Sequence, residues 1–245
     1  MMPHYNQTFF SGAASKKSAQ LACLFDHIMA VAVAVLIIVI YWGVVVLNKN
    51  RAASYLYKEH KSLEFAWTVI PMLLLLWVAV PSLYLLYKHG ESPQMAFVTV
   101  KVIGHQWYWE YEISCWEVMG FDTFAFDSYM VPNSELKFGQ PQLLTVDKPL
   151  VLPYGVPVRM LGTSADVIHS WTLPAMGVKM DTLPGRMNEV FITALKPGIA
   201  KGMCSEICGD KHAHMPIEVE FISPTDFTAW LKEICAKLGF KEGEE

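Results

Sequence analysis

The chain has 245 residues, of which 53% are hydrophobic and only 17% are charged, and its formal net charge is −4. That length is enough for one or two domains with a packed core, and the mild acidity excludes a strongly basic nucleic-acid-binding protein. Soluble domains average about 25% charged residues, so the deficit points to segments that avoid water.

Two long segments carry no charged residue. The first is Ile28 to Leu47, with 20 uncharged residues, and the second is Phe65 to Tyr87, with 23. A helix needs roughly 20 apolar residues to cross the hydrocarbon of a bilayer. The alternative, two buried helices of a soluble core, is disfavoured because a chain of this size hardly hides two such runs. The sequence therefore predicts a transmembrane two-helix hairpin over residues 21–90.

The segment between the two predicted helices is basic, with Lys49, Arg51, Lys58 and Lys61. Basic loops stay on the cytoplasmic or matrix side of a membrane. The N-terminus and everything after Tyr87 are then expected on the opposite, oxidising side. Residues 1–20 show no clear helix and no convincing cleavable signal, so we expect a disordered or loosely attached N-terminal arm.

After Tyr87 the hydrophobic pattern changes to a period of two. It is clearest over Ala96 to Gly104 and Pro216 to Ile222, and weaker over Val156 to Leu161 and Glu189 to Thr193. Such runs, broken by Gly, Pro and Asp, indicate a β-sandwich or barrel over residues 91–222. Ser223 as N-cap, followed by Pro224, then predicts a C-terminal helix and polar tail over residues 223–245.

A dense group of metal ligands lies near the end of the β-region. Within twelve residues, Cys204, Cys208, His212 and Met215 offer two thiolates, an imidazole and a thioether. Soft sulfur with imidazole suits copper or zinc, and the thioether favours copper. The spacing keeps the two sulfurs close enough to bridge a pair of metal ions. A Cys204–Cys208 disulfide, a mononuclear zinc site and a core Met215 remain alternatives, and His214 remains a rival ligand.

His169 precedes the cysteine-rich segment by 35 residues in Asp166-Val-Ile-His-Ser-Trp171. A lone histidine in a strand is more often a core residue than a ligand. Beside a predicted copper loop, however, His169 becomes a candidate for a fifth side-chain ligand.

An aromatic and acidic stretch follows the first predicted strand. No Lys or Arg occurs between Lys101 and Lys137, and the stretch begins with Trp107, Tyr108 and Trp109. Such a surface would attract a basic partner; the alternatives are a solvated face for the acids and a core position for the aromatic residues. The acids are Glu110, Glu112, Glu117, Asp122, Asp127 and Glu135.

The motifs together resemble cytochrome c oxidase subunit II. The resemblance rests on Cys-Ser-Glu-Ile-Cys-Gly-x-x-His-x-x-Met at 204–215, Asp-Val-Ile-His-Ser-Trp at 166–171, Gly-His-Gln-Trp-Tyr-Trp at 104–109 and Asp-Thr-Leu-Pro-Gly-Arg at 181–186. It runs from about Asp26 to about Trp230. It implies a membrane α-helical hairpin followed by an all-β, cupredoxin-like Greek-key sandwich that holds the dinuclear copper centre called copper A.

The resemblance also implies a role for each ligand. Cys204 and Cys208 match the bridging thiolates, and His169 and His212 match the terminal imidazoles. Met215 matches a weak ligand to one copper. Glu206 matches a residue whose backbone carbonyl binds the other copper, and whose carboxylate helps to bind a magnesium ion shared with subunit I. A carboxylate suits such a hard cation.

The remaining implied roles concern electrons, protons and partners. Trp107 matches the residue where electrons from cytochrome c enter, and Glu64 matches a glutamate at the mouth of a proton pathway, with a helix cap as its alternative role. Ala165 departs from the family, which commonly has an acid there, so the docking surface is expected to differ. The expected docking residues are Trp107, Tyr108, Glu110, Glu112, Asp127, Asp147 and Asp166.

The predicted function is therefore that of a subunit of a proton-pumping cytochrome c oxidase. Electrons from cytochrome c pass through copper A to the haem a of subunit I, where oxygen is reduced. Subunits I and III, further subunits and the lipid bilayer are the other expected partners. The expected location is the mitochondrial inner membrane with the β-domain in the intermembrane space, or alternatively a bacterial inner membrane with a periplasmic domain. A membrane-anchored copper chaperone is the alternative function; its single helix and thioredoxin-like fold fit this chain less well.

Overall fold

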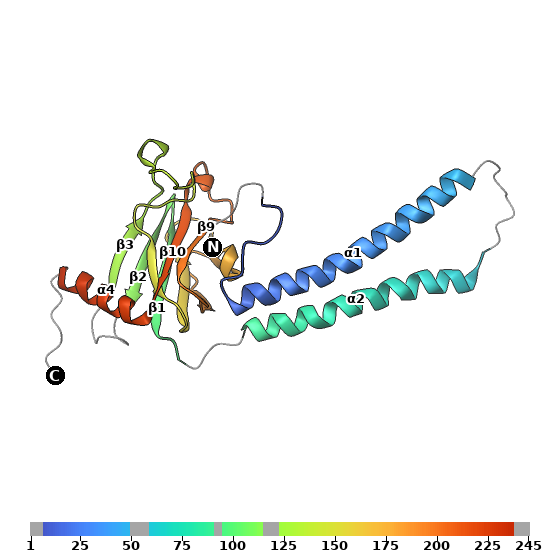
Figure 1. The fold of residues 1–245 in the computed structure, drawn as a ribbon, viewed down its shortest axis with the longest axis horizontal. Helices are drawn as coiled ribbons and strands as arrows, with labels where there is room; N and C mark the ends of the chain where they lie inside the picture. Colours follow the sequence, from blue (N-terminus) through green and yellow to red (C-terminus); the bar gives the residue numbers. More distant parts are fainter. Residues whose placement is uncertain (1–6, 50–58, 91–94, 115–122, 238–245) are drawn as a thin grey trace. The chain divides into compact units, whose positions relative to one another are not determined.

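A computed structural model describes residues 7–49, 59–90, 95–114 and 123–237. The chain divides into two compact units, one formed by residues 20–91 and the other by residues 1–19 together with 92–245. The first unit is helical and the second is built mainly of β-strands (Figure 1).

The helical unit is a hairpin of two long helices, α1 (Lys16–Lys49) and α2 (Lys61–Gly90). Both are long and apolar enough to cross a membrane, and almost none of their apolar surface is buried within the chain. Near the open end of the hairpin, His89 Nε2 lies 3.1 Å from Gln20 Oε1. Pro71 and Pro81 lie inside α2. Most of the predicted basic loop falls at residues 50–58, outside the described residues.

The β-unit contains a five-stranded sheet in the order β3-β2-β1-β5-β8, a three-stranded sheet in the order β4-β10-β9, and the pair β6-β7. In the first sheet β1 pairs antiparallel with β2 and parallel with β5; in the second, β10 pairs antiparallel with β9 and parallel with β4. The bounds are β1 Val98–His105, β2 Tyr108–Ser114, β3 Phe124–Ser128, β4 Leu150–Pro153, β5 Val158–Ser164, β6 His169–Leu173, β7 Val178–Thr182, β8 Asn188–Ile192, β9 Gly198–Met203 and β10 Pro216–Ile222.

Alternation along the strands fills the core of this unit. Alternate residues of β1 and β2, such as Val100 and Tyr111, are buried, while most of the residues between them are partly exposed. The helix α4 (Pro224–Lys237) covers part of the core through Phe227 and Leu231. Ser223 caps it, since its Oγ accepts the Asp226 N–H at 3.1 Å. Among the described residues, three short 3-10 helices lie between strands: η1 Asn133–Glu135, η2 Pro174–Met176 and η3 His212–His214.

The N-terminal arm differs from the expectation of a loosely attached segment over residues 1–20. Helix α1 already begins at Lys16, and Ala14, Ser15 and Ser18 are buried against the β-unit. The Ala14 N–H donates to Ala175 O at 2.8 Å, and Ser15 Oγ donates to Met176 O at 2.6 Å. Small side chains allow this close approach, which hydrophobic periodicity cannot reveal because none of them belongs to an apolar run.

A charge placed at the buried arm should destabilise the β-unit. We expect Ala14→Asp to cost about 3 kcal/mol, because Ala14 has no exposed surface and a carboxylate there would be buried without a partner. Gly12→Asp is the matched control, since a side chain at the exposed Gly12 would meet no atom within 4 Å. Thermal unfolding of the full chain in detergent, followed by circular dichroism, measures both; equal melting temperatures would refute the contact.

Candidate metal centre

The predicted copper segment is the loop that joins β9 to β10. Its two ends are held together, because the Cys204 N–H donates to Met215 O at 3.2 Å. Trp109 Nε1 donates to the same carbonyl at 3.4 Å. Cys204, Cys208 and Met215 are all buried, so their sulfurs lie in a shell from which water is largely excluded.

The sulfur and imidazole groups converge on Cys208. Its Sγ lies 4.0 Å from Cys204 Sγ, 3.4 Å from Met215 Sδ and 3.5 Å from His212 Nδ1. Cys204 Sγ in turn lies 3.3 Å from the backbone O of Glu206. Both cysteines are free thiols, so the predicted alternative of a disulfide is not realised in the structure. His214, the rival ligand, is exposed and forms none of these contacts.

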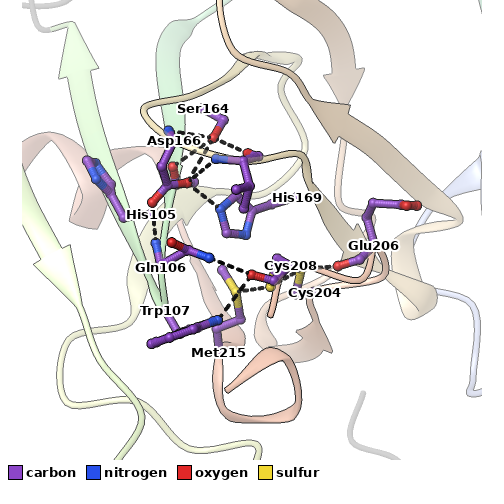
Figure 2. A network of polar contacts seen from close by, with 12 residues as sticks. His105, Gln106, Trp107, Ser164, Asp166, His169, Cys204, Glu206, Cys208 and Met215 are labelled. Carbon is purple, nitrogen blue, oxygen red and sulfur yellow. Dashed lines mark hydrogen bonds and ion pairs between the residues drawn. The ribbon is translucent and has the colours of Figure 1, made fainter. Parts of the chain in front are cut away.

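Strand β6 delivers His169 to the same group. A ring nitrogen of His169 and the two cysteine sulfurs all lie within 4.8 Å of one another. His169 Nε2 lies 2.9 Å from Asp166 Oδ1, whereas the buried Nδ1 has no hydrogen-bond partner among the described residues. Figure 2 shows the imidazole between Asp166 and the two cysteines. A buried nitrogen without a partner is costly unless something binds it, so this atom is available to a metal.

Two glycines make room for that arrangement. A Cβ on Gly104 of β1 would lie 2.7 Å from His169 Cδ2, so the imidazole occupies the space of a missing side chain. A Cβ on Gly202 of β9 would lie 1.8 Å from Thr172 O, so β6 and β9 can approach only with glycine there. The Ser205 N–H also donates to Ser170 O at 3.0 Å and links the metal loop to β6.

The two thiols differ in acidity. Burial raises the pKa of Cys204, but interactions with His169 and with the backbone N–H of Ser170 outweigh it and lower the pKa to about 7. Burial and the nearby charge of Cys204 raise the pKa of Cys208 to about 12. A metal that binds both sulfurs as thiolates must therefore displace protons from this pair of thiols.

These donors fit copper better than they fit a hard cation. Two thiols, two imidazoles and a thioether are soft or borderline ligands, which copper accepts and which magnesium and calcium do not. A structural zinc site uses cysteine and histidine only, whereas here the Met215 thioether lies directly beside Cys208. His169, Cys204 and Cys208 thus form a possible metal site, and Met215 and His212 lie beside Cys208.

Trp107 lies directly against the metal loop. Its indole Nε1 donates to Cys208 O at 3.3 Å, and Gln106 Nε2 donates to the same oxygen at 2.9 Å. A Cβ on Gly209 would lie 3.1 Å from Trp107 Cζ2, so the half-buried indole packs on the backbone beyond Cys208. One hydrogen bond followed by a few covalent bonds thus connects the indole with the Cys208 sulfur (Figure 2).

Comparison with known proteins agrees with this geometry. A model of the cytochrome c oxidase subunit II periplasmic domain matches residues 98–222, and a model of the subunit II transmembrane domain matches residues 3–85. The chain belongs to the cytochrome c oxidase subunit II family. It is thus an integral membrane protein and a subunit of an oxidoreductase complex.

Individual members of the subunit II family align over most of the chain. Cytochrome c oxidase subunit 2 of Albinaria caerulea is 42% identical over 226 residues, which cover 92% of this chain and 98% of that protein. The cockroach Periplaneta americana protein is 42% identical over 219 residues, covering 89% and 93%. The crystal structure of the periplasmic domain of subunit II from Bradyrhizobium japonicum is 41% identical, with a TM-score of 0.51, and covers 60% of this chain and 98% of that one.

Several of the acids predicted to form the docking surface of this subunit II already have partners. Glu112 forms an ion pair with Lys101 at 2.9 Å, and Glu110 pairs with His105 at 2.8 Å. Asp166 also accepts the Gln106 N–H at 2.7 Å, so one carboxylate holds both the His169 ring and the backbone just before Trp107. Although burial alone would raise it, these hydrogen bonds hold the pKa of Asp166 below its ordinary value.

The other predicted docking residues lie on or beside the first sheet. Tyr108 is stacked between His105 and Tyr129, with ring centroids 4.6 and 4.5 Å away. The Tyr129 hydroxyl donates to Asp127 at 3.2 Å, and its N–H donates to Asp147 at 2.7 Å. Glu117 and Asp122 fall outside the described residues. Sequence reasoning missed Gln106, Gly104 and the support that Asp166 gives to His169.

Glu64, the residue predicted at a proton pathway, lies in the first turn of α2 and is half-buried. Carboxylates are favoured at this end of a helix, so the position suits the capping role that the sequence left open. The Leu63 and Glu64 N–H groups donate to His60 O at 2.9 and 3.0 Å.

Proposed function

We propose that the chain binds a dinuclear copper A centre, receives electrons from cytochrome c and passes them to the haem a of subunit I. The observation that carries this proposal is the buried group of soft ligands with Trp107 hydrogen-bonded to its central cysteine. In this proposal Cys204, Cys208, His169 and His212 would hold the copper ions through their side chains, and Met215 and the backbone carbonyl of Glu206 would complete the set. The bound copper pair would supply one-electron redox chemistry.

The residues of the chain keep this electron transfer fast by keeping the site rigid and dry. The ligands sit in a buried shell, and the Cys204–Met215 hydrogen bond closes the loop on itself. Asp166 orients the His169 ring by bonding its Nε2, which directs the other nitrogen toward the sulfurs. Because no ligand needs to move, little reorganisation accompanies a change of one electron.

Glu206 serves two metal ions in this proposal. Its backbone oxygen points at Cys204 Sγ, while its side chain is exposed. That carboxylate is free to bind a magnesium ion shared with subunit I, since hard divalent cations prefer oxygen ligands. Glu64 would lie at the opening of a proton pathway into subunit I. Subunit III and further subunits complete the oxidase.

Copper content and spectrum test the proposal most directly. Full-length protein loaded with copper should bind two copper ions per chain, and electron paramagnetic resonance should show one unpaired electron shared equally by both nuclei. The spectrum expected from a single copper, or a protein that takes up only zinc, would contradict the dinuclear site.

The proposed location is the mitochondrial inner membrane with the β-unit in the intermembrane space, or the equivalent periplasmic side of a bacterial membrane. Protease added to matrix-side-out vesicles is expected to cut only between the two helices, where the basic residues lie. Lys137, which is exposed on the β-unit, should be cut only in vesicles of the opposite orientation. Cleavage at Lys137 in matrix-side-out vesicles would refute this topology.

A further inference from the structure

A lysine of the metal loop lies over the indole that faces this loop. Lys211 Nζ is 5.8 Å from the centre of the Trp107 ring, within the range of a cation–π interaction. Within the described part of the chain, Lys211 forms no ion pair. Its ammonium is therefore not neutralised by a carboxylate, and the indole is its contact.

The backbone of the same loop holds another part of the indole. Gly209, with a φ of +119°, packs on Trp107, and Cys208 O accepts the indole N–H. Residues 208, 209 and 211 thus all contact the indole: the first accepts its N–H, the second packs on its ring, and the ammonium of the third lies over the ring. Besides Lys211, the half-buried indole is held by the hydrogen bond to Cys208 O, by its packing on Gly209 and by the edge of the core on which it packs.

The charge of Lys211 also opposes docking. The acids predicted to attract a basic donor include Glu110 and Asp166, and Lys211 places a positive charge beside the indole that the donor must approach. Exposed charges act on a charged partner over roughly 10 Å at 0.1 M salt. A cation here weakens the attraction of a basic protein, so association alone does not explain its presence.

We propose that Lys211 is a positioning residue, which holds the Trp107 indole in the orientation for electron transfer and thereby weakens binding of a basic electron donor. This inference rests on the proposed function of Trp107. It assigns opposite effects to one side chain: a faster electron transfer in the bound complex and a lower affinity at low salt. A residue that only stabilised the loop would not produce that combination.

The test compares Lys211→Gln with Lys211→Arg in the purified, fully assembled oxidase. Hydroxyl-radical footprinting with mass spectrometry reports the exposure of each tryptophan, and the fully buried Trp109 two residues away serves as an internal control for folding. In Lys211→Gln we expect oxidation of Trp107 to rise about threefold while Trp109 stays protected, since an exposed cation–π contact changes populations by roughly that factor. Lys211→Arg should restore the protection.

Kinetics with cytochrome c supply the second measurement. In Lys211→Gln the KM for cytochrome c at low ionic strength should fall severalfold, and the rate of copper reduction in the bound complex should fall about threefold. Both values should return toward those of the unmodified protein in Lys211→Arg. Unchanged footprinting of Trp107 would overturn the proposal, as would a slower reaction that Arg does not rescue. Trp107→Phe is measured in parallel: if that variant transfers electrons normally, the proposed role of Trp107 is wrong, whereas the footprint still tests the Lys211 contact.

Discussion

Trp107→Phe is expected to slow electron transfer from cytochrome c to copper by orders of magnitude while leaving the affinity for cytochrome c nearly unchanged. The substitution removes the indole N–H that donates to Cys208 O and leaves every surface charge in place. Because the donor would dock as before, the defect should appear in the bound complex. Stopped-flow reduction of the copper site at two salt concentrations separates the two steps.

Neutralisation of the neighbouring acids is the matched control for Trp107→Phe. Glu110→Gln and Glu112→Gln should weaken association and flatten its salt dependence, because exposed charges steer the donor over long range. Glu110→Gln also removes the carboxylate that pairs with His105, and Glu112→Gln removes the one that pairs with Lys101. Bound cytochrome c should still deliver electrons at a near-normal rate. If Trp107→Phe instead lowers the melting temperature and transfers electrons normally, Trp107 is only a packing residue.

Cys208→Ser is expected to abolish the proposed dinuclear copper centre. Cys208 Sγ lies 3.4 Å from Met215 Sδ and 3.5 Å from His212 Nδ1, so replacing it removes the donor around which the proposed ligands are grouped. His169 and Cys204 remain and can hold one copper at most. The copper content should therefore fall from two ions per chain to one or none, and the electron paramagnetic resonance spectrum of a shared electron should disappear.

Histidine variants distinguish this loss from general damage to the loop. His212→Ala should lose the shared-electron spectrum as well, whereas His214→Ala, at an exposed position only two residues away, should retain it. A His214→Ala protein that loses copper, together with a His212→Ala protein that keeps it, would reverse the assignment of the ligand.

The parts of the site that are contiguous in the chain were the most predictable. The proposed ligands from Cys204 to Met215 lie in one loop, so their types and spacing indicated a soft metal site, and the strand Pro216–Ile222 was predicted with the bounds that the structure has. Strand β6 was not predicted, because all five of its residues are buried and show no alternation. The proposed ligand role of His169 therefore came from the accompanying copper loop and from the family resemblance, and not from its local pattern.

Contacts that depend on strand register could not be read from the sequence. Lys101 and Glu112 meet because β1 and β2 pair with these two residues opposite one another. The prediction of an acidic surface did not include this ion pair, so it overestimated the negative charge that is available to a partner. The contact of Asp166 with Gln106 was missed for a similar reason, since it joins residues that are 60 positions apart.

The buried N-terminal arm also constrains the order in which the subunit can be completed. Ser15 and its acceptor Met176 are separated by 161 residues, and Lys17 donates to Phe191 O across 174. A ribosome makes the arm first and its partners long afterwards, and contacts of such long range form late in folding. The arm must meanwhile be kept on the side of the membrane where the β-unit will fold. If only one of the two helices crossed the membrane, the arm and the β-unit would lie on opposite sides and Ala14 could not reach its buried position. Folding of the β-unit is therefore completed only after both helices have been inserted.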